Sequence, residues 1–596
     1  MDFIGYLGKG IGLEPGNKLH AGKIASNQLS IVGRYKVYIF GTITAKYKEA
    51  KGSPAESVVE LYETYGDTFQ RHLEGQFLII IADDKSVRFF NDRYSYKNCY
   101  YYHGGGYFVF AGSLKLLLKH LPFEPEFDLD CVPSFLATGF SFTEKTQFKD
   151  ICRMPPASTL IYDTKLRFAD HLDDEFRFDV RPVEDLDERL NEYETVFQES
   201  IRNSIIAAKA KRVGCFLSGG QDTAFALIQA SKVFLKPIHT FTARFAGSGF
   251  DEVPKAQEIS GRFRGIHHVI TIDPKSLDVL PDMIRILEEP ISGSSFVFYI
   301  CAKEAAKHAD LVITGDGGDT LWNEYYPVAE WHRYLRHMPS AGRKLLHQVS
   351  RMSLWLSDWE RLWELEHTLS LFTPKDYYSD FFQRLCTYRH FNERLLRSLL
   401  RDDYELYRPK KKLHMNADNF YLQLIIQKMF YGVYPYLVPI SQKVIEHYGM
   451  AYAAPYLNRK VMDFITSLPA EWVNSGTRWQ KIFNDAEKRR FHKEALLRYL
   501  PKRFVYSMQR SFDVPWTVLL NRRPGLLAWL LKRLKARGWY NNEVLDRIFS
   551  EFAVMKAKPH ELCQLKLHGY RIYSLLSLEI WCMQFLDKKE IRLDDL

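Results

Sequence analysis

A short apolar strand that leads through a glycine turn into a helix lies at Val213–Ala230. The apolar run Val213–Leu217 is followed by Ser218–Gly220, and the helix begins at Gln221. Small residues at a helix N-terminus leave backbone N–H groups accessible, and together with the helix dipole they bind anions such as phosphate. Asp222, in the first helical turn, offers a carboxylate to a Mg²⁺ ion. A Gly-Gly pair alone is equally typical of a plain turn, so this loop by itself does not identify a phosphate site.

Strands alternate with helices around this element. The pattern predicts helices over 184–210, 253–265, 280–289 and 296–308, and further strands over 238–245, 267–272 and 311–314. Such alternation is typical of a parallel sheet covered by helices, with a ligand crevice beyond the carboxyl ends of the strands. The glycine-rich turns at 218–220 and 315–318 both follow strands, so we expect them to face one crevice.

Carboxylates accompany both turns. Asp222 follows the first turn, and Asp316 and Asp319 belong to the second. Acidic groups from separate strand ends suit a Mg²⁺-bound triphosphate, because the metal bridges phosphates while backbone N–H groups bind the phosphate oxygens. The alternative is that these side chains only cap helices, Asp222 in particular. The presence of two such turns favours the phosphate site.

The first part of the chain has a different pattern. It is predicted to be mainly β, with helices at 56–65 and 113–120 and hairpins at 77–90 and 99–110. Many short antiparallel strands indicate a layered sheet domain, whereas the chain beyond Leu321 is predicted to be helical. We therefore predict a mixed α/β and α+β protein with two domains, residues 1–178 and 179–596.

Composition argues against several partners and locations. A net charge of +9 over 596 residues is mild and includes no basic tail, the densest run being Lys410–Lys412, so we expect no nucleic-acid partner. The eight cysteines include no C-x-x-C pair, which predicts reduced, mostly buried thiols. Neither a signal peptide nor an apolar run of membrane-spanning length is visible, so we expect a cytoplasmic protein with no membrane partner.

Several ordered motifs resemble a known family. LSGGQDT at 217–223 is similar to the SGGxDS signature of the N-type ATP pyrophosphatases, and together with ITGDGGD at 313–319 it resembles the synthetase domain of the asparagine synthetase family. The segments 241–245, 448–472 and 500–515 also resemble that domain. Residues 73–84, 91–102 and 110–118 resemble the family's glutaminase-type domain, so the similarity covers most of the chain.

The resemblance implies carboxylate activation. ATP adenylates a carboxylate, pyrophosphate leaves with Mg²⁺, and an amine attacks the acyl-adenylate to form an amide. Asp222 and Asp319 would ligate Mg²⁺, and Asp316 would assist deprotonation of the amine. The residues implied to bind ATP and pyrophosphate are Leu217, Ser218, Gly219, Gly220, Gln221, Asp222, Thr223 and Gly315, with Ala243 beside the adenine.

The N-terminal domain departs from the family's pattern. The glutaminase nucleophile should be a cysteine directly after the initiator methionine, but this residue is Asp2, and a carboxylate cannot replace a thiolate. The family's Arg-His-Arg-Gly-Pro-Asp stretch is absent, and its Asn-Gly-Glu loop reads Phe40-Gly41-Thr42-Ile43. We therefore expect no glutamine hydrolysis and a domain that serves as a scaffold.

The family's phosphate-binding cations are also changed. One lysine aligns with Gln509, beside Arg510, and an upstream lysine aligns with Gln480, beside Lys481. The arginine after it aligns with Asn484, and the glutamate that follows the second turn is replaced by Thr320. A missing cation can cost about 10²- to 10³-fold in rate. We expect Arg510 to take the catalytic charge and Lys481 to bind phosphate.

Three functions remain open. The first is an ATP-dependent amide synthetase that uses an amine already present in its substrate, as in the related β-lactam synthetases and lasso peptide cyclases. It would close a peptide macrolactam in natural-product or antibiotic biosynthesis, and a helper protease or leader-binding protein would be a further partner. The second is an ammonia- or partner-fed amidotransferase that acts on a small or sugar-linked carboxylate. The third is a catalytically silent paralogue.

Overall fold

The computed structural model describes most of the chain and all the strands around the glycine turns. The described residues are 3–8, 29–45, 53–140, 144–163, 165–170, 179–246, 251–322, 326–356, 368–373, 391, 393–402, 404, 424–425, 428–429, 436–476, 480, 487–507, 514–554 and 563–594.

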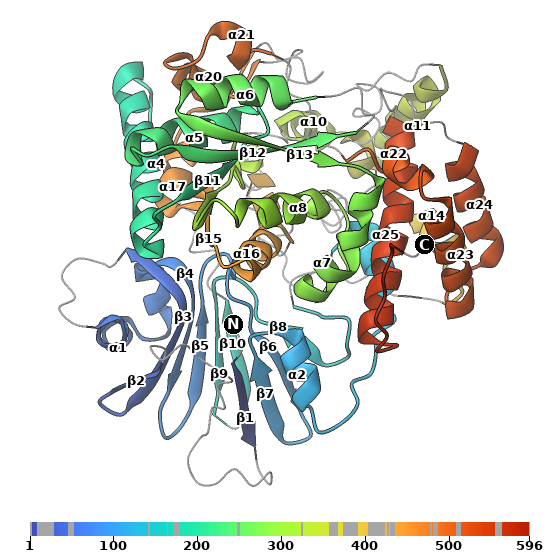
Figure 1. Ribbon diagram of the computed structural model, residues 1–596, viewed down its shortest axis with the longest axis horizontal. Coiled ribbons are helices and arrows are strands. Elements are labelled where there is room, and N and C mark those ends of the chain that lie inside the picture. Colours follow the sequence, from blue (N-terminus) through green and yellow to red (C-terminus); the bar gives the residue numbers. More distant parts are fainter. Residues whose placement is uncertain are drawn as a thin grey trace.

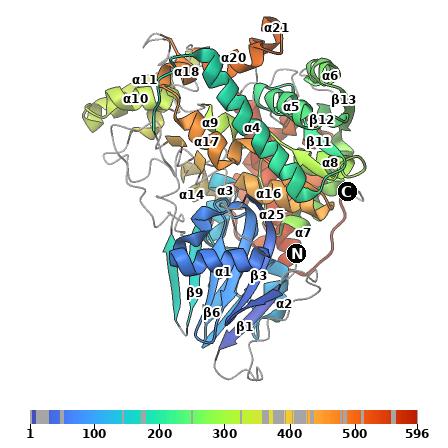
Figure 2. The ribbon, with the colours of Figure 1, turned by 90° about the vertical axis from the view of Figure 1, so that its left-hand side faces the viewer.

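The N-terminal domain consists of two antiparallel sheets with a helical layer outside (Figures 1 and 2). The four-stranded sheet has the order β1 (Ile4–Gly8), β7 (Tyr107–Ala111), β6 (Tyr100–Gly104) and β8 (Ile151–Arg153). The six-stranded sheet has the order β10 (Leu166–Asp170), β9 (Ser158–Tyr162), β5 (Val87–Asn91), β4 (Glu74–Ala82), β3 (Tyr35–Ala45) and β2 (Leu29–Val32). Its helices are α1 (Pro54–Tyr65), η1 (Gly66–His72), α2 (Leu114–His120) and α3 (Cys131–Thr138).

Strand β4 shows how the layers are held together. Successive strand residues point to opposite faces, so Phe77, Ile79 and Ile81 pack under α1 and η1. Leu78 and Ile80 pack between the two sheets. All five side chains are buried, which explains why this strand is apolar without alternation.

The second domain is built on a parallel sheet. Its order is β13 (Gly265–Ile272), β12 (Ile238–Phe245), β11 (Val213–Phe216), β14 (Leu311–Ile313) and β15 (Ala451–Ala453). Figure 1 shows α5 and α6 on one side of this sheet and α8 and α16 on the other. The strand order reverses between β11 and β14, and the carboxyl ends at such a switch point form the usual ligand crevice of open α/β sheets.

Helices make up most of the rest, and Figure 2 shows the longest of the early ones, α4, crossing the second domain. The helices up to β14 are α4 (Leu186–Ala208), α5 (Gln221–Val233), α6 (Val253–Arg262), η3 (Pro274–Val279), α7 (Leu280–Leu287) and α8 (Ser295–Ala305). Those after β14, among the described residues, are α9 (Gly318–Leu321), α10 (Tyr326–Leu335), α11 (Ser340–Leu356), α14 (Glu393–Leu399), α16 (Val438–His447), η6 (Pro455–Leu457), α17 (Arg459–Thr466), α18 (Ala470–Val473), α20 (Arg490–Leu497), α21 (Lys502–Val505), α22 (Trp516–Asn521), α23 (Pro524–Arg537), α24 (Asn542–Val554) and α25 (Cys563–Phe585).

The fold class expected from the sequence is confirmed, with three corrections. The helix expected over 296–308 ends at Ala305, so His308 lies beyond it. The region after Leu321 is not only helical, because β15 adds a fifth strand to the parallel sheet and β16 (Asn474–Ser475) pairs with β17 (Glu487–Lys488). The helix expected over 253–265 ends at Arg262, since Arg264 has a positive φ of 57° and Gly265 opens β13. The domain boundary at 178 adjoins residues outside the described ranges and stays a prediction.

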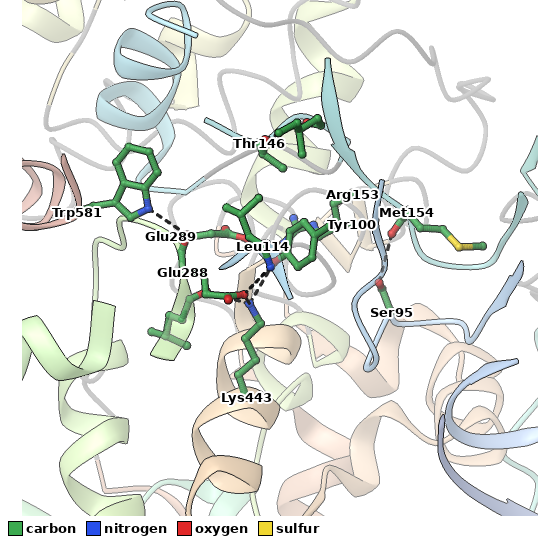
Figure 3. Close-up of polar contacts among 12 residues, drawn as sticks. Ser95, Tyr100, Leu114, Thr146, Arg153, Met154, Glu288, Glu289, Lys443 and Trp581 are labelled. Atoms are coloured by element: carbon green, nitrogen blue, oxygen red, sulfur yellow. Dashed lines mark hydrogen bonds and ion pairs between the residues drawn. The ribbon is translucent and has the colours of Figure 1, made fainter. Parts of the chain in front are cut away.

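A buried polar network joins the two domains (Figure 3). Glu288, directly after α7, accepts hydrogen bonds from the backbone N–H groups of Leu114 at 3.0 Å and Lys115 at 3.1 Å, at the start of α2. Lys443 on α16 lies 3.3 Å from the Glu288 carboxylate and donates to the Tyr100 hydroxyl at 3.1 Å. Arg153 on β8 pairs with Glu289 at 2.9 Å, so a buried charge pair and backbone hydrogen bonds as well as apolar packing connect the two domains (Figure 3).

The sequence predicts no membrane-spanning segment and reduced, mostly buried thiols. Among the described helices, none has the length and apolar character that a bilayer crossing requires. Six cysteines are described as free thiols, four of them buried, as the sequence predicts.

Candidate active site

The first glycine turn connects β11 to α5, and its small residues let a bound group approach the backbone closely. Gly219 has a φ of +70°, in the left-handed region that favours glycine. The Ser218 N–H donates to Thr223 Oγ1 at 3.3 Å, which fixes the turn against the first turn of α5. The side chain of Gln221 is used structurally, because its Nε2 donates to the carbonyl of Val505 at 2.9 Å.

The second glycine turn follows β14 and touches the first. Strands β11 and β14 are adjacent and parallel, with Cys215 opposite Ile313, so both turns lie at the same sheet edge. Gly317, before α9, has a φ of +89°. A Cβ added to Gly318 would lie 2.6 Å from Cγ of Asp222. A side chain at position 318 would therefore displace this carboxylate, which explains why glycine is required there.

One cation connects the carboxylates of the two turns. The Nη1 atom of Arg489 donates to Asp222 Oδ2 at 2.8 Å, and its Nη2 atom donates to Asp319 Oδ1. The Arg489 side chain is 14% exposed, while that of Asp319 is 69% exposed. Arg489 lies at the N-cap of α20 with a φ of 58°, so it adopts an uncommon backbone conformation in this position.

The charge on Asp222 is stabilised by its neighbours. Burial alone would raise its pKa, but the Arg489 guanidinium and His492 together lower the pKa of Asp222 well below its ordinary value. Tyr456 donates to the backbone carbonyl of Asp222 at 3.1 Å. Asp222 is therefore held ionised, as a metal-ligating carboxylate has to be.

The carboxylate pair fits a Mg²⁺ ion bound together with a nucleotide. Asp222 Oδ1 is buried and has no hydrogen-bond partner of good geometry among the described residues, and the Nε2 atom of His492 is 3.4 Å from it. Mg²⁺ is usually bound by one or two carboxylates plus substrate phosphates. Asp222 and Asp319 would hold the ion, and Arg489 would remain beside it as a second positive charge.

Asp316 occupies a different environment from Asp222. The hydroxyl of Tyr452, on β15, donates to Asp316 Oδ2 at 2.5 Å. Burial raises the pKa of Asp316 above its ordinary value, although hydrogen bonds from Tyr452, Ser441 and Thr314 oppose this effect. A raised pKa makes a carboxylate a better proton acceptor near neutral pH.

The N-terminal domain contacts Tyr452, the residue that binds Asp316. Gln76 Nε2, on β4, donates to the backbone carbonyl of Tyr452 at 2.8 Å. The ring of Tyr96 lies 5.9 Å from the ring of Tyr452, centroid to centroid. Gln76 and Tyr96 of the first domain therefore position Tyr452, whose hydroxyl binds Asp316 in the second domain.

The structure brings most of the predicted site residues to one sheet edge. Asp222, Asp316 and Asp319 lie on adjacent turns, and Ala243 lies on β12, next to β11. The other residues at this edge are Leu217, Ser218, Gly219, Gly220, Gln221, Thr223 and Gly315. Lys481 and Arg510 lie outside the described residues, as do Asn484 and Gln509. Gln480 is described and exposed.

Arg489, His492 and Tyr452 are the site residues that the motifs did not single out. Arg489 belongs to the basic run Lys488–Arg490, which is the one local signal in the sequence for this cation. Its partner Asp222 is 267 positions away, so the contact depends on the tertiary fold. Tyr452 lies within the segment 448–472, whose resemblance to the family did not mark any single residue.

Apolar groups fill the N-terminal domain where the resemblance would place a glutaminase site. The ring of Phe3 stacks on that of Phe40 with centroids 4.3 Å apart. Phe40 and Gly41 lie within β3, opposite Leu78 and Phe77 of β4. Cys99 belongs to the same buried cluster, and burial raises the pKa of its thiol far above the ordinary value. A thiol held protonated in this way is a poor nucleophile.

Comparisons with known proteins agree with this two-part arrangement. Residues 192–582 match the sequence model of a family described as asparagine synthase, and residues 24–170 match that of a glutamine amidotransferase domain.

Curated relatives are similar over part of their length. A candidate glutamine-hydrolysing asparagine synthetase of Methanocaldococcus jannaschii is 25% identical over 59% of this chain and 70% of its own length. Asparagine synthetase 1 of Bacillus subtilis, also described as glutamine-hydrolysing, is 26% identical over 51% of this chain and 49% of its own. The amidase chry2 of Gibberella zeae is 26% identical over 52% of this chain and 47% of its own. The chain thus spans about half the length of two of these relatives.

Proposed function

The chain belongs to the asparagine synthase family, and we propose that it is an ATP-dependent ligase that joins a carboxylate to an amine without hydrolysing glutamine. The observation that carries this proposal is the meeting of Asp222, Asp319 and Asp316 at the carboxyl ends of β11 and β14. Two of these carboxylates are bound by one guanidinium and the third by a tyrosine hydroxyl, so their environments differ.

Activation of the carboxylate would take place at the first two acids. A substrate carboxylate oxygen attacks the α-phosphorus of ATP, the bond to the β-phosphate breaks, and pyrophosphate leaves. Asp222 and Asp319 would hold a Mg²⁺ ion, which would neutralise phosphate charge. Arg489 supplies a further positive charge, and the Gly219 turn offers backbone N–H groups to the leaving pyrophosphate.

Amide formation would use Asp316. The amine nitrogen attacks the acyl carbon of the adenylate, AMP leaves, and the proton lost by the amine is accepted by Asp316. The raised pKa of Asp316 suits this role, and its hydrogen bond from Tyr452 fixes the orientation of the carboxylate.

The amine would come from a source other than glutamine. Asp2 provides no thiol, and the Phe3 and Phe40 rings belong to an apolar cluster in which an amide substrate would lose its hydrogen bonds. Cys99 is buried and held protonated, so it does not replace the missing nucleophile. The N-terminal domain would instead support Tyr452 through Gln76.

An amine within the substrate itself is the source that we favour. The product would then be a peptide macrolactam, in which an Asp or Glu side chain is joined to the peptide's N-terminal amine. The second candidate is an ammonia-fed amidotransferase. The relatives' names favour amide formation on a small carboxylate, as in an asparagine synthetase, but those relatives are described as glutamine-hydrolysing.

Release of AMP and pyrophosphate from Mg-ATP, compared between two classes of substrate, distinguishes these functions. The full chain is assayed with linear peptides that have a free N-terminal amine and an internal Asp or Glu, and separately with ammonium and small carboxylic acids. AMP together with a peptide lighter by one water supports the cyclase, and AMP with ammonium supports the amidotransferase.

Two controls complete this experiment. Asp222→Ala should abolish AMP release with every substrate if the metal assignment is right. Glutamate released from glutamine would contradict the proposed loss of glutaminase activity. ATP that binds without any turnover would favour the catalytically silent paralogue.

A further inference from the structure

Three histidines meet on the face of the parallel sheet that α8 covers. His239 is the second residue of β12, His268 is on β13, and His308 follows the end of α8. One ring nitrogen of each lies within 4.8 Å of a ring nitrogen of the other two. All three side chains are partly exposed, so the cluster is accessible from solvent.

Strand register produces this meeting. His239 pairs with Ile266, and Phe241, two residues further along β12, pairs with His268. Residues two apart in a strand share a face, so the two histidines lie diagonally on one side of the sheet. His267 is on the opposite side, where its Nδ1 atom is 2.9 Å from Thr240 Oγ1. The sheet therefore separates two consecutive histidines, and only His268 joins the cluster.

The end of α8 supplies the third ring. His308 follows the helix by a short turn, in which its N–H donates to the carbonyl of Ala305 at 2.9 Å. Its ring stacks on that of His268 with centroids 4.2 Å apart and on that of His239 at 5.1 Å. The Nδ1 atom of His239 is 2.9 Å from Nε2 of His268. The three imidazoles thus lie side by side, each with a nitrogen toward the others.

We propose that His239, His268 and His308 bind one divalent transition-metal ion, with Zn²⁺ the preferred occupant. Imidazole nitrogen is a common ligand of zinc, with three protein ligands and a water completing a tetrahedron at Zn–N distances of about 2.0–2.1 Å. The rings have to rotate out of their stack to reach that geometry, which side chains that are partly exposed can do. Mg²⁺ prefers oxygen ligands, so this site would not compete for the ion at Asp222.

Glu304 is placed to orient one of the ligands. It lies one helical turn before His308 on the same side, with Oε1 3.7 Å from His308 Nε2 and Oε2 2.6 Å from Lys307 Nζ. Carboxylates that bind a ligating histidine fix its ring and strengthen its binding. Glu304 is therefore a positioning residue of the proposed site.

The cationic side chains near the three histidines are paired with carboxylates, which reduces their repulsion of a bound metal ion. The Arg212 guanidinium lies 2.7 Å from Asp310 Oδ1, and Lys307 is bound by Glu304. The cluster lies toward the amino ends of β12 and β13, whereas the glycine turns follow the carboxyl ends of β11 and β14. A bound ion would thus fasten β12 and β13 to the end of α8, away from the candidate active site.

Zinc binding to the full chain tests the proposal. Protein stripped with a chelator is dialysed against Zn²⁺ with millimolar Mg²⁺ present to occupy carboxylate sites, and bound zinc is measured by elemental analysis. We expect one Zn²⁺ per chain with a Kd of about 1 µM or below. Co²⁺ in place of Zn²⁺ should give the intense visible absorption of a four-coordinate ion.

Variants identify the ligands. His268→Asn or His239→Asn should weaken zinc binding by at least tenfold, and Glu304→Gln by about tenfold or more. His103→Asn, which removes an exposed histidine of β6 in the other domain, should leave binding unchanged. Zinc binding weaker than about 100 µM, or equal binding by wild type and the His268 and His239 variants, would overturn the proposal. Circular dichroism confirms that each variant is folded.

Discussion

The Arg489 guanidinium donates to the Asp222 carboxylate at 2.8 Å, and Arg489 also binds Asp319 from the second glycine turn. A charge pair of this kind has two consequences. It balances a carboxylate that is only 6% exposed, and it places a fixed cation beside the position where phosphates would bind. We therefore expect both the stability of the site and its chemistry to depend on Arg489.

Replacing Arg489 with methionine should reduce both stability and adenylation. Loss of one partner from a buried pair costs about 3–5 kcal/mol, because Asp222 is left without its main compensating charge. Loss of a positioned cation should lower the rate of pyrophosphate release by about 10²- to 10³-fold. Urea unfolding and pyrophosphate release measure the two effects.

Arg503→Met is the matched control for Arg489. Its side chain is 72% exposed and forms a surface pair with Glu258, so its loss should cost less than about 1 kcal/mol. An Arg489 variant that keeps the wild-type rate of pyrophosphate release would show that this cation does not act on the phosphates.

The rate of amide formation should depend on the ionisation of Asp316. Its pKa is raised by burial, and only the ionised carboxylate accepts a proton, so the rate should increase as the pH rises through this pKa. Tyr452→Phe removes a hydrogen bond that stabilises the ionised form, so the pKa should rise further and the profile should move to higher pH. Single-turnover amide formation from a preformed adenylate measures this profile.

Asp316→Asn separates the two chemical steps. The rate of amide formation should fall by about 10²- to 10⁴-fold and lose this pH dependence, while pyrophosphate release changes little. Asp84→Asn, at the exposed turn between β4 and β5, should change neither rate. Equal losses in both steps would mean that Asp316 acts on adenylation or on folding instead.

Two glycines give a matched test of the contact between the turns. Gly318→Ala would place Cβ 2.6 Å from Cγ of Asp222, so the carboxylate or the second turn must move. We expect a loss of about 1–3 kcal/mol in the free energy of unfolding and slower pyrophosphate release. Gly261→Ala, in α6, has open space around the added Cβ and should stabilise the protein by about 0.5–1 kcal/mol. Equal stability of the two variants would contradict the contact.

Local sequence patterns predicted the strands and turns of the site better than its cationic side chains. Strand β12 was predicted at Ile238–Phe245, and the two glycine turns were expected to share one edge, because apolar runs and glycine turns are local signals. Strand β15 was missed, since Ala451–Ala453 is short, lacks β-branched residues and pairs with β14 far earlier in the chain. Arg489 was missed because its partners lie in distant segments, and the three histidines are equally dispersed in sequence. These features depend on strand order and register.

The buried pair Arg153–Glu289 should couple the stability of the two domains, because Arg153 is on β8 and Glu289 lies just after α7. Arg153→Met would leave the Glu289 carboxylate, whose side chain is 15% exposed, without this charge, at a cost of about 3–5 kcal/mol. Glu289→Gln should also destabilise, because the buried Arg153 guanidinium loses the Glu289 charge. The double variant should cost less than the sum, with a coupling energy of about 1–3 kcal/mol.

A double-mutant cycle in urea measures this coupling, with the exposed pair Lys149–Glu126 as control. Its side chains are 49% and 70% exposed, so its coupling should be below about 1 kcal/mol. A similarly small value at Arg153–Glu289 would show that this charge pair does not hold the domains together. A larger value, with both domains unfolding in one transition, would show that the pair fixes the N-terminal domain against the second domain, whose Tyr452 it also contacts through Gln76. The first domain would then contribute to the candidate active site by supporting it.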